Sequence, residues 1–344
     1  YAKSKELEEG SYTVKEISAP AGFIVDATAH DVNVKPEETS TVKSSDIPQN
    51  NPISLILQKL DLETGEGKPQ GNSSLANAEF TIKFYTELSD TDPATSGKKP
   101  VRTWVMKTNA SGEMHFTKDY FVSGDEFYYA SDKKTVCLPI GTVTIQETKA
   151  PKNYFLNETV FVQKITGSGS QESVSIYNAS NVEEQVYRGG VKVQKRDLET
   201  QDTVSQGNAT LAGATFSITT LNEQPVWVNG KLYQKDEMCL TIITDENGLA
   251  STEEKALPVG HYRIEETQAP TGYLKDGAKT LEFEITKDGE MVDLTSKDTS
   301  IANQVIRGGV KVQKRDIETG ETKPQGNATL EGATFTITNL STHP

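Results

Sequence analysis

Three polar residues occupy positions where the pattern of apolar side chains predicts the interior of a β-structure. Side chains alternate between the two faces of a strand, so residues two positions apart share a face. Each polar residue continues an apolar series in this way: Val191, Val193 and Lys195; Tyr262, Ile264 and Glu266; Ile301 and Asn303. We therefore expect Lys195, Glu266 and Asn303 to be buried together.

These three side chains have the chemistry to form a covalent bond. Burial disfavours charge, so Lys195 can become a neutral nucleophile and Glu266 can keep its proton. A protonated Glu266 would polarise the side-chain carbonyl of Asn303 for attack by Lys195, and would then shuttle the proton. The product is an amide between the first and last strands of a domain. Ammonia leaves, or water where aspartate replaces asparagine.

The alternative is a buried lysine–glutamate ion pair with an asparagine beside it. A buried charge without a partner is costly, and an ion pair would satisfy both charges without any reaction. However, the same arrangement of residue types recurs in phase in a second part of the chain. The recurrence favours the covalent reaction.

Internal repetition is the strongest pattern in the 344 residues. One element recurs as LQKLDLETGEGKPQGNSSLANAEF from Leu57, VQKRDLETQDTVSQGNATLAGATF from Val193 and VQKRDIETGETKPQGNATLEGATF from Val312. A second recurs as YTVKEISAPAGF from Tyr12, VTIQETKAPKNYF from Val143 and YRIEETQAPTGY from Tyr262. The elements alternate, which predicts the end of one domain at 1–52, complete domains at 53–188 and 189–307, and the start of another at 308–344. Because the first and last domains are incomplete, we expect a fragment of a longer protein.

Within each repeat the pattern is that of short strands. Apolar residues alternate with polar ones over short runs, turn sequences such as DENG separate the runs, and no segment has a sustained helical period. Many short strands of this kind predict an all-β fold of tandem β-sandwiches. Because the joins between repeats are short, we expect the domains to lie end to end as a semi-rigid rod.

Composition narrows the classes of function. The net charge of −14 argues against nucleic acid or an anionic membrane as a partner, since both require basic surfaces. Cys137 and Cys239 fall at positions of their repeats that do not correspond, so no disulfide framework is expected. No apolar run is long enough to span a membrane, the histidines form no metal-ligand spacing, and we expect no metal and no cofactor.

The repeats resemble the collagen-adhesin B-type (Cna B-type) domains of SpaA-like pilins and adhesins of Gram-positive bacteria. The motifs that carry the resemblance are VKVQKRD, GATFSI, LPVGHYRIEETQAPTGY and SIANQVIRGG, and the likeness extends over essentially the whole chain. It implies immunoglobulin-like (prealbumin-like) sandwiches, spontaneous intramolecular isopeptide bonds, and an extracellular protein attached to the cell wall by sortase through a part outside this fragment.

The resemblance also implies roles for individual residues. In the 189–307 repeat, Lys195 is the nucleophile, Glu266 the catalytic acid and Asn303 the acceptor. In the 53–188 repeat, Lys59 and Glu147 match, and the acceptor is either Asn178, which we favour, or Asn181. The incomplete repeats supply Glu16 as a catalytic acid, Asp46 as an acceptor and Lys314 as a nucleophile, each without a full set of partners.

Three functions compete. The first is a structural stalk of a surface adhesin or pilin-like protein, in which the full-length protein carries the host extracellular-matrix or cell-surface ligand. The second is that the repeats themselves bind a host protein or glycan, for which the aromatic-rich segment 87–134 is the candidate. The third, an enzyme acting on an external substrate, is the least favoured, because self-cross-linking already accounts for every candidate catalytic group.

Overall fold

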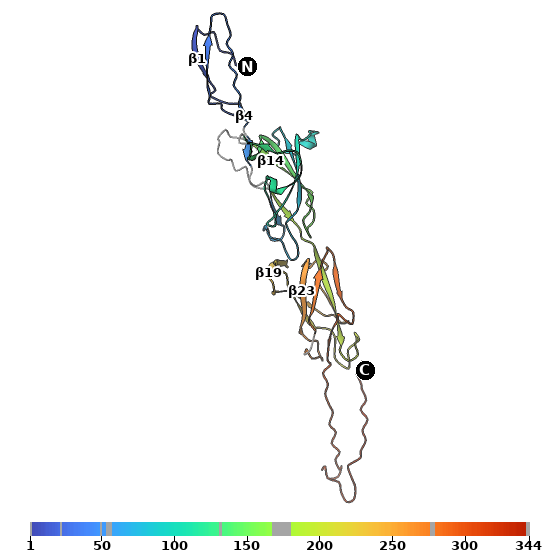
Figure 1. Ribbon diagram of the computed structural model, residues 1–344. Coiled ribbons are helices and arrows are strands. Elements are labelled where there is room, and N and C mark those ends of the chain that lie inside the picture. The colour runs from blue at the N-terminus through green and yellow to red at the C-terminus, as the bar shows by residue number, and fades with distance from the viewer. Residues whose placement is uncertain are drawn as a thin grey trace. The chain divides into compact units, whose positions relative to one another are not determined.

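The computed structural model describes residues 2–20, 23–48, 50–52, 57–130, 133–166, 180–275 and 279–341. Side chains are described for the same residues except 24, 47, 48, 50–52 and 180–184. The chain divides into two compact units (Figure 1). Unit 1 comprises Tyr1–Pro69 and Ser73–Val186, and unit 2 comprises Gln70–Asn72 and Tyr187–Pro344.

The leading part of unit 1 is a pair of small antiparallel sheets. Strand β1 (Gly10–Lys15), labelled in Figure 1, pairs with β3 (Ala29–Val34), and β2 (Phe23–Ile24) pairs with β4 (Ile47–Pro48). Most described side chains of these strands are exposed or half-buried.

The rest of unit 1 is a sandwich with a five-stranded sheet ordered β10-β8-β7-β13-β14. Two three-stranded sheets, ordered β15-β6-β9 and β11-β12-β5, complete it. The strands are β5 (Asn50–Pro52), β6 (Leu57–Asp61), β7 (Glu79–Tyr85), β8 (Arg102–Lys107), β9 (Glu113–Met114), β10 (Phe121–Gly124), β11 (Tyr128–Tyr129), β12 (Val136–Pro139), β13 (Gly141–Lys149), β14 (Val160–Ile165) and β15 (Ser180–Glu184).

Apolar side chains from the facing sheets form one core in this sandwich. Leu57 of β6 packs in the same buried cluster as Phe80 of β7 and Ile145 of β13. The aromatic residues of the 87–134 segment belong here too: Trp104 and Phe127 lie in the core, and Tyr120, Phe121, Tyr128 and Tyr129 pack against it half-buried. These rings therefore serve the interior rather than an exposed binding surface.

Unit 2 is a second sandwich. One sheet has the order β20-β17-β23-β24, and the other is built around β16, which pairs with β21, β22, β25 and β26. A separate hairpin joins β18 and β19. The strands are β16 (Arg188–Asp197), β17 (Thr215–Thr220), β18 (Val226–Val228), β19 (Lys231–Tyr233), β20 (Met238–Ile243), β21 (Leu249–Ser251), β22 (Leu257–Pro258), β23 (Gly260–Gln268), β24 (Leu281–Ile285), β25 (Met291–Leu294) and β26 (Ile301–Asn303).

Strand β16 has close neighbours on several sides because its second and third residues are glycines. A Cβ atom on Gly189 would lie 2.4 Å from the carbonyl oxygen of Glu290, and one on Gly190 would lie 2.4 Å from the hydroxyl of Thr252. A side chain at either position would collide with its neighbours. The Arg-Gly-Gly sequence thus lets the first strand run through the middle of its sheet.

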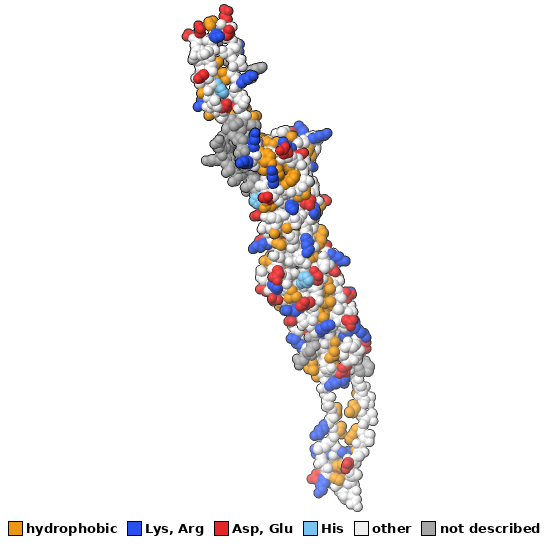
Figure 2. Space-filling model, viewed as in Figure 1, with side chains coloured by type: hydrophobic (Ala, Val, Ile, Leu, Met, Phe, Trp, Pro, Cys, Tyr) orange, Lys and Arg blue, Asp and Glu red, His pale blue; other side chains and the backbone are white. Residues whose placement is uncertain are grey.

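The predicted all-β class with tandem sandwiches is confirmed, whereas the end-to-end rod and the domain boundaries remain predictions. The two helices among the described residues are single 3-10 turns, η1 (Pro93–Ser96) and η2 (Lys118–Tyr120), and neither could span a membrane. Residues 308–341 contain no strand. On the face shown in Figure 2, acidic and basic side chains are interspersed rather than gathered by sign.

Candidate functional site

The two sheets of unit 2 bring Lys195, Glu266 and Asn303 together. Strand β16 carries Lys195, and the parallel neighbour β26 carries Asn303. In their register Lys195 lies opposite Ile301, and Asp197 lies opposite Asn303. Glu266 comes from β23 in the other sheet. The site is therefore inside the sandwich, with the first and last strands of the domain side by side.

The carboxyl group of Glu266 contacts both the amine of Lys195 and the side-chain amide of Asn303. Lys195 Nζ lies 3.1 Å from Glu266 Oε1, and Asn303 Nδ2 donates a hydrogen bond to Glu266 Oε2 at 2.7 Å. Two backbone carbonyls complete the cluster: Ile301 accepts from Lys195 Nζ at 3.4 Å, and Leu274 accepts from Asn303 Nδ2 at 2.5 Å. The carboxylate is thus in contact with both nitrogen atoms that a cross-linking reaction would involve.

Burial controls the protonation of this cluster. The exposed fraction is 0% for Lys195, 4% for Glu266 and 1% for Asn303, as the alternating pattern of the sequence predicted. Loss of hydration is the largest influence on the pKa of Lys195 and lowers it, although the Glu266 charge opposes the change. A lysine with a lowered pKa yields its neutral, nucleophilic form more readily.

The contact between Glu266 and Asn303 differs in one respect from the sequence expectation. We expected the acid to face the carbonyl oxygen of Asn303, whereas it accepts a hydrogen bond from the amide nitrogen. Asn303 Oδ1 has no hydrogen-bond partner among the described residues. Because Glu266 Oε2 acts as an acceptor in this contact, the N–H end of the amide faces it.

A second cluster lies in the sandwich of unit 1. Lys59 Nζ on β6 donates to Glu147 Oε1 on β13 at 2.7 Å, and both side chains are fully buried. The other carboxylate oxygen, Oε2, accepts from the backbone N–H of Asn157 at 2.8 Å. Of the two acceptors considered from sequence, Asn178 lies outside the described residues, and Asn181 pairs through its backbone with Gln58.

The residues predicted in the incomplete repeats are less enclosed. Glu16 is half-buried and accepts from the backbone N–H of Asp26 at 2.7 Å, the same ten-residue spacing as between Glu147 and Asn157. Asp46 is half-buried, and Lys314 is exposed in a segment without strands. Among their described residues, neither incomplete repeat has a buried cluster of the kind seen around Lys195.

Sequence reasoning missed a buried tyrosine–aspartate contact beside each cluster. The hydroxyl of Tyr273 donates to Asp197 at 2.9 Å, and that of Tyr154 donates to Asp61 at 2.8 Å. The signal was available, because each aspartate follows the nucleophilic lysine by two residues and each tyrosine ends the EETQAP-type segment. The contact fixes the turn that precedes Leu274, whose carbonyl holds Asn303.

Asp197 is buried but keeps its charge. Burial acts to raise its pKa, but hydrogen bonds from Thr200, Gln206, Tyr273 and Glu199 outweigh burial, and the net pKa is lowered. A carboxyl whose pKa is lowered by folding stabilises the folded state above its unfolded pKa, about 3.9. That stabilisation is lost as the pH falls through the folded value.

Tyr273→Phe is therefore expected to destabilise unit 2 in a pH-dependent manner. At pH 7 the variant loses a hydrogen bond to a buried charge, which costs about 1.5–3 kcal/mol. The difference from wild type should shrink as the pH falls through the lowered folded-state pKa of Asp197, because protonation removes the charge that the hydroxyl stabilises. Urea unfolding at pH 7 and pH 3 measures both values. An equal difference at the two pH values would contradict the charge-assisted role, and Tyr233→Phe on the β18–β19 hairpin is the control.

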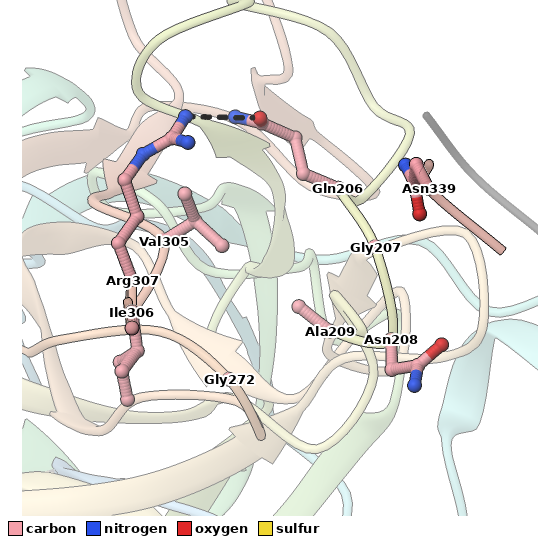
Figure 3. Close-up of a pocket in the computed structure, with 10 residues that line it drawn as sticks. Gln206, Gly207, Asn208, Ala209, Gly272, Val305, Ile306, Arg307 and Asn339 are labelled. Atoms are coloured by element: carbon pink, nitrogen blue, oxygen red, sulfur yellow. Dashed lines mark hydrogen bonds between the residues drawn. The ribbon is translucent and has the colours of Figure 1, made fainter. Parts of the chain in front are cut away.

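A pocket of about 580 Å³ in unit 2 lies apart from the cluster. Glycine, alanine and short polar residues line much of it, and Arg307 donates to Gln206 Oε1 at its edge at 3.3 Å (Figure 3). Lys195, Glu266 and Asn303 do not line it. The cluster therefore lies in the packed interior of the sandwich and not in this pocket.

Comparison with known proteins places these features in a family. A family model for the SpaA prealbumin-like fold domain matches residues 1–48, 57–180 and 191–300. Among solved structures, the chain is similar to the Bacillus anthracis TIE protein, with 26% identity and a TM-score of 0.49 over 86% of this chain and 42% of that one. It thus spans less than half the length of that protein.

Two pilins are also similar. The minor pilin of Streptococcus agalactiae has 16% identity and a TM-score of 0.27, with 77% of this chain and 100% of that chain covered. The shaft pilin SpaA from Lactobacillus rhamnosus GG has 16% identity and a TM-score of 0.26, with 76% and 100% covered. No curated protein matches the chain.

Proposed function

The chain belongs to the SpaA prealbumin-like fold domain family, and from this premise we propose that it is part of a pilin-like structural stalk whose domains cross-link themselves. The observation that carries the proposal is the buried cluster of Lys195, Glu266 and Asn303 between the sheets of unit 2. The stalk would act on the surface of a Gram-positive cell. A host ligand and a sortase-made link to the wall would involve other parts of the full-length protein.

The contacts support a defined sequence of proton transfers. Transfer of a proton from Lys195 Nζ to Glu266 gives a neutral amine and a neutral acid. The amine attacks the side-chain carbon of Asn303, and the acid delivers its proton to the amide nitrogen, to which Oε2 is already hydrogen-bonded. A carbon–nitrogen bond forms to Lys195, the bond to Nδ2 breaks, and ammonia leaves. The second proton lost by Nζ returns to Glu266.

Two features make such a bond useful in this fold. The amide would close a loop of roughly a hundred residues, and by analogy with disulfides this restricts the unfolded chain by on the order of 4–5 kcal/mol. Cys137 and Cys239 are buried in different units, and no disulfide joins them in the described structure. An amide also resists the thiols that reduce disulfides. The cross-link would therefore brace an extracellular domain without cysteine chemistry.

The intact mass of the purified chain tests the proposal. A cross-link between Lys195 and Asn303 lowers the mass by one molecule of ammonia, and peptide mapping is expected to recover the two strands as one branched peptide. The Asn303→Ala variant should show no such deficit and no branched peptide at this site. A wild-type chain with its full calculated mass would contradict the proposal and leave the cluster as a buried ion pair.

A further inference from the structure

Strand β15, the last strand of the first sandwich, contains a candidate acceptor that is not an asparagine. In unit 2, Tyr273 bridges to Val305, and the backbone N–H of Leu274 donates to the carbonyl of Gln304 at 2.9 Å. In unit 1 the same pattern recurs: Tyr154 bridges to Val186, and Phe155 donates to Gln185 at 3.1 Å. The residue before Gln304 is Asn303, and the residue before Gln185 is Glu184.

The strand register leads to the same correspondence independently. Strand β15 runs parallel to β6, with Glu184 opposite Asp61, just as Asn303 lies opposite Asp197. In each repeat the lysine precedes that aspartate by two residues. Glu184 thus occupies the backbone position, relative to Lys59, that Asn303 occupies relative to Lys195.

The register also separates Glu184 from Asn181. Val182 lies opposite Lys59, so residues 182 and 184 share the strand face of the lysine, whereas Asn181 lies opposite Gln58 on the other face. Gln58 is half-buried, while Lys59 is fully buried. An acceptor at position 181 would therefore approach from the wrong side of the sheet.

We propose that Glu184 is the acceptor for Lys59, so that the first sandwich closes with a lysine–glutamate amide. The inference rests on the proposed self-cross-linking function. In the reaction, the neutral amine of Lys59 attacks the carboxyl carbon of Glu184, a carbon–nitrogen bond forms and a carbon–oxygen bond breaks. Glu147 takes a proton from Nζ and gives one to the leaving hydroxyl, so water leaves and Glu147 ends as it began.

Charge in the core favours this condensation. Two glutamates and one lysine enclosed together would carry an unpaired negative charge if all were ionised, and a buried charge without a partner is costly. Condensation replaces the lysine and the acceptor carboxyl with a neutral amide, so no unpaired charge has to stay buried.

The Glu184→Gln variant provides a sharp test. Glutamine would lose ammonia where glutamate loses water, and both reactions give the same lysine amide. The cross-linked wild type and the cross-linked variant should therefore have identical intact masses, although their unreacted chains differ. In wild type we expect a total deficit of one ammonia from Lys195–Asn303 and one water from Lys59–Glu184, with both branched peptides recovered.

Further variants distinguish failure of this inference from failure of the proposed function. Glu184→Ala should abolish the water loss and keep the ammonia loss, and Glu183→Ala, one residue earlier on the other face, should keep both. A deficit of two ammonia molecules with Lys59 joined to Asn178 would overturn the role of Glu184 but preserve self-cross-linking. A single ammonia loss would also overturn it, since Lys59 would then be unlinked. No deficit at all would reject the proposed function itself.

Discussion

Glu266→Ala is expected to be the most damaging single substitution in unit 2. It removes the group that moves protons between Lys195 and Asn303, so the amide should not form and the ammonia deficit should disappear. The loss of the loop constraint costs on the order of 4–5 kcal/mol. Removing one partner of a buried ion pair costs about 3–5 kcal/mol more, because the lysine keeps a charge without compensation. A domain has about 5–15 kcal/mol of stability in total, so the variant should be close to unfolding.

Mass spectrometry and thermal unfolding of the same samples measure both effects, and two variants separate chemistry from packing. Glu265→Ala changes the adjacent, half-buried residue of β23 and should keep the bond, with little loss of stability. Glu266→Gln keeps the size of the side chain but cannot exchange a carboxylic proton. It should therefore unfold at a higher temperature than the alanine variant and still lack the amide. Normal amide formation in Glu266→Gln would rule out the assigned role of the acid.

Asn303→Ala is expected to change how unit 2 responds to force. With the amide in place, tension entering at β16 passes directly to β26, and the residues between Lys195 and Asn303 should not extend. Without it, roughly a hundred residues are released, which at about 3.3–3.6 Å per residue adds on the order of 35 nm of length. Single-molecule pulling measures this step directly.

Asn303→Asp is the matched control for the pulling experiment. Aspartate can still react, with loss of water instead of ammonia, so the domain should again resist extension. A wild-type domain that unfolds over its full length at modest force would show that the amide does not carry the load. The intact mass of each sample, recorded before pulling, identifies which molecules contain the bond.

The buried faces of the site strands were predictable because their patterns are regular. Val191, Val193 and Lys195 alternate on β16 without interruption, and a lysine in such a series has one consistent interpretation. The sequence could not reveal that β16 and β26 are parallel neighbours, because pairing depends on the whole sandwich and not on either strand. The orientation of the Asn303 amide could not be predicted either, because it depends on the hydrogen bond to Glu266.

The acceptor residue for Lys59 in the first sandwich was harder to predict from the sequence. Asn178 was favoured because it continues the alternation of Val174 and Ile176, and it remains a prediction because it lies outside the described residues. The Gln-Val-x-Arg-Gly-Gly sequence follows both Glu184 and Asn303, and it is the sequence signal on which the proposal of Glu184 depends.

The proposed reaction can occur only while the three-residue strand β26 is paired with β16, because that pairing brings Asn303 to Lys195. The amide, once formed, cannot reverse when ammonia has diffused away. Each time the strand pairs with β16, the amide can form irreversibly. A newly made population would contain domains that lack the amide, and their number could only decline. The fraction without the amide would therefore decrease with the age of the protein.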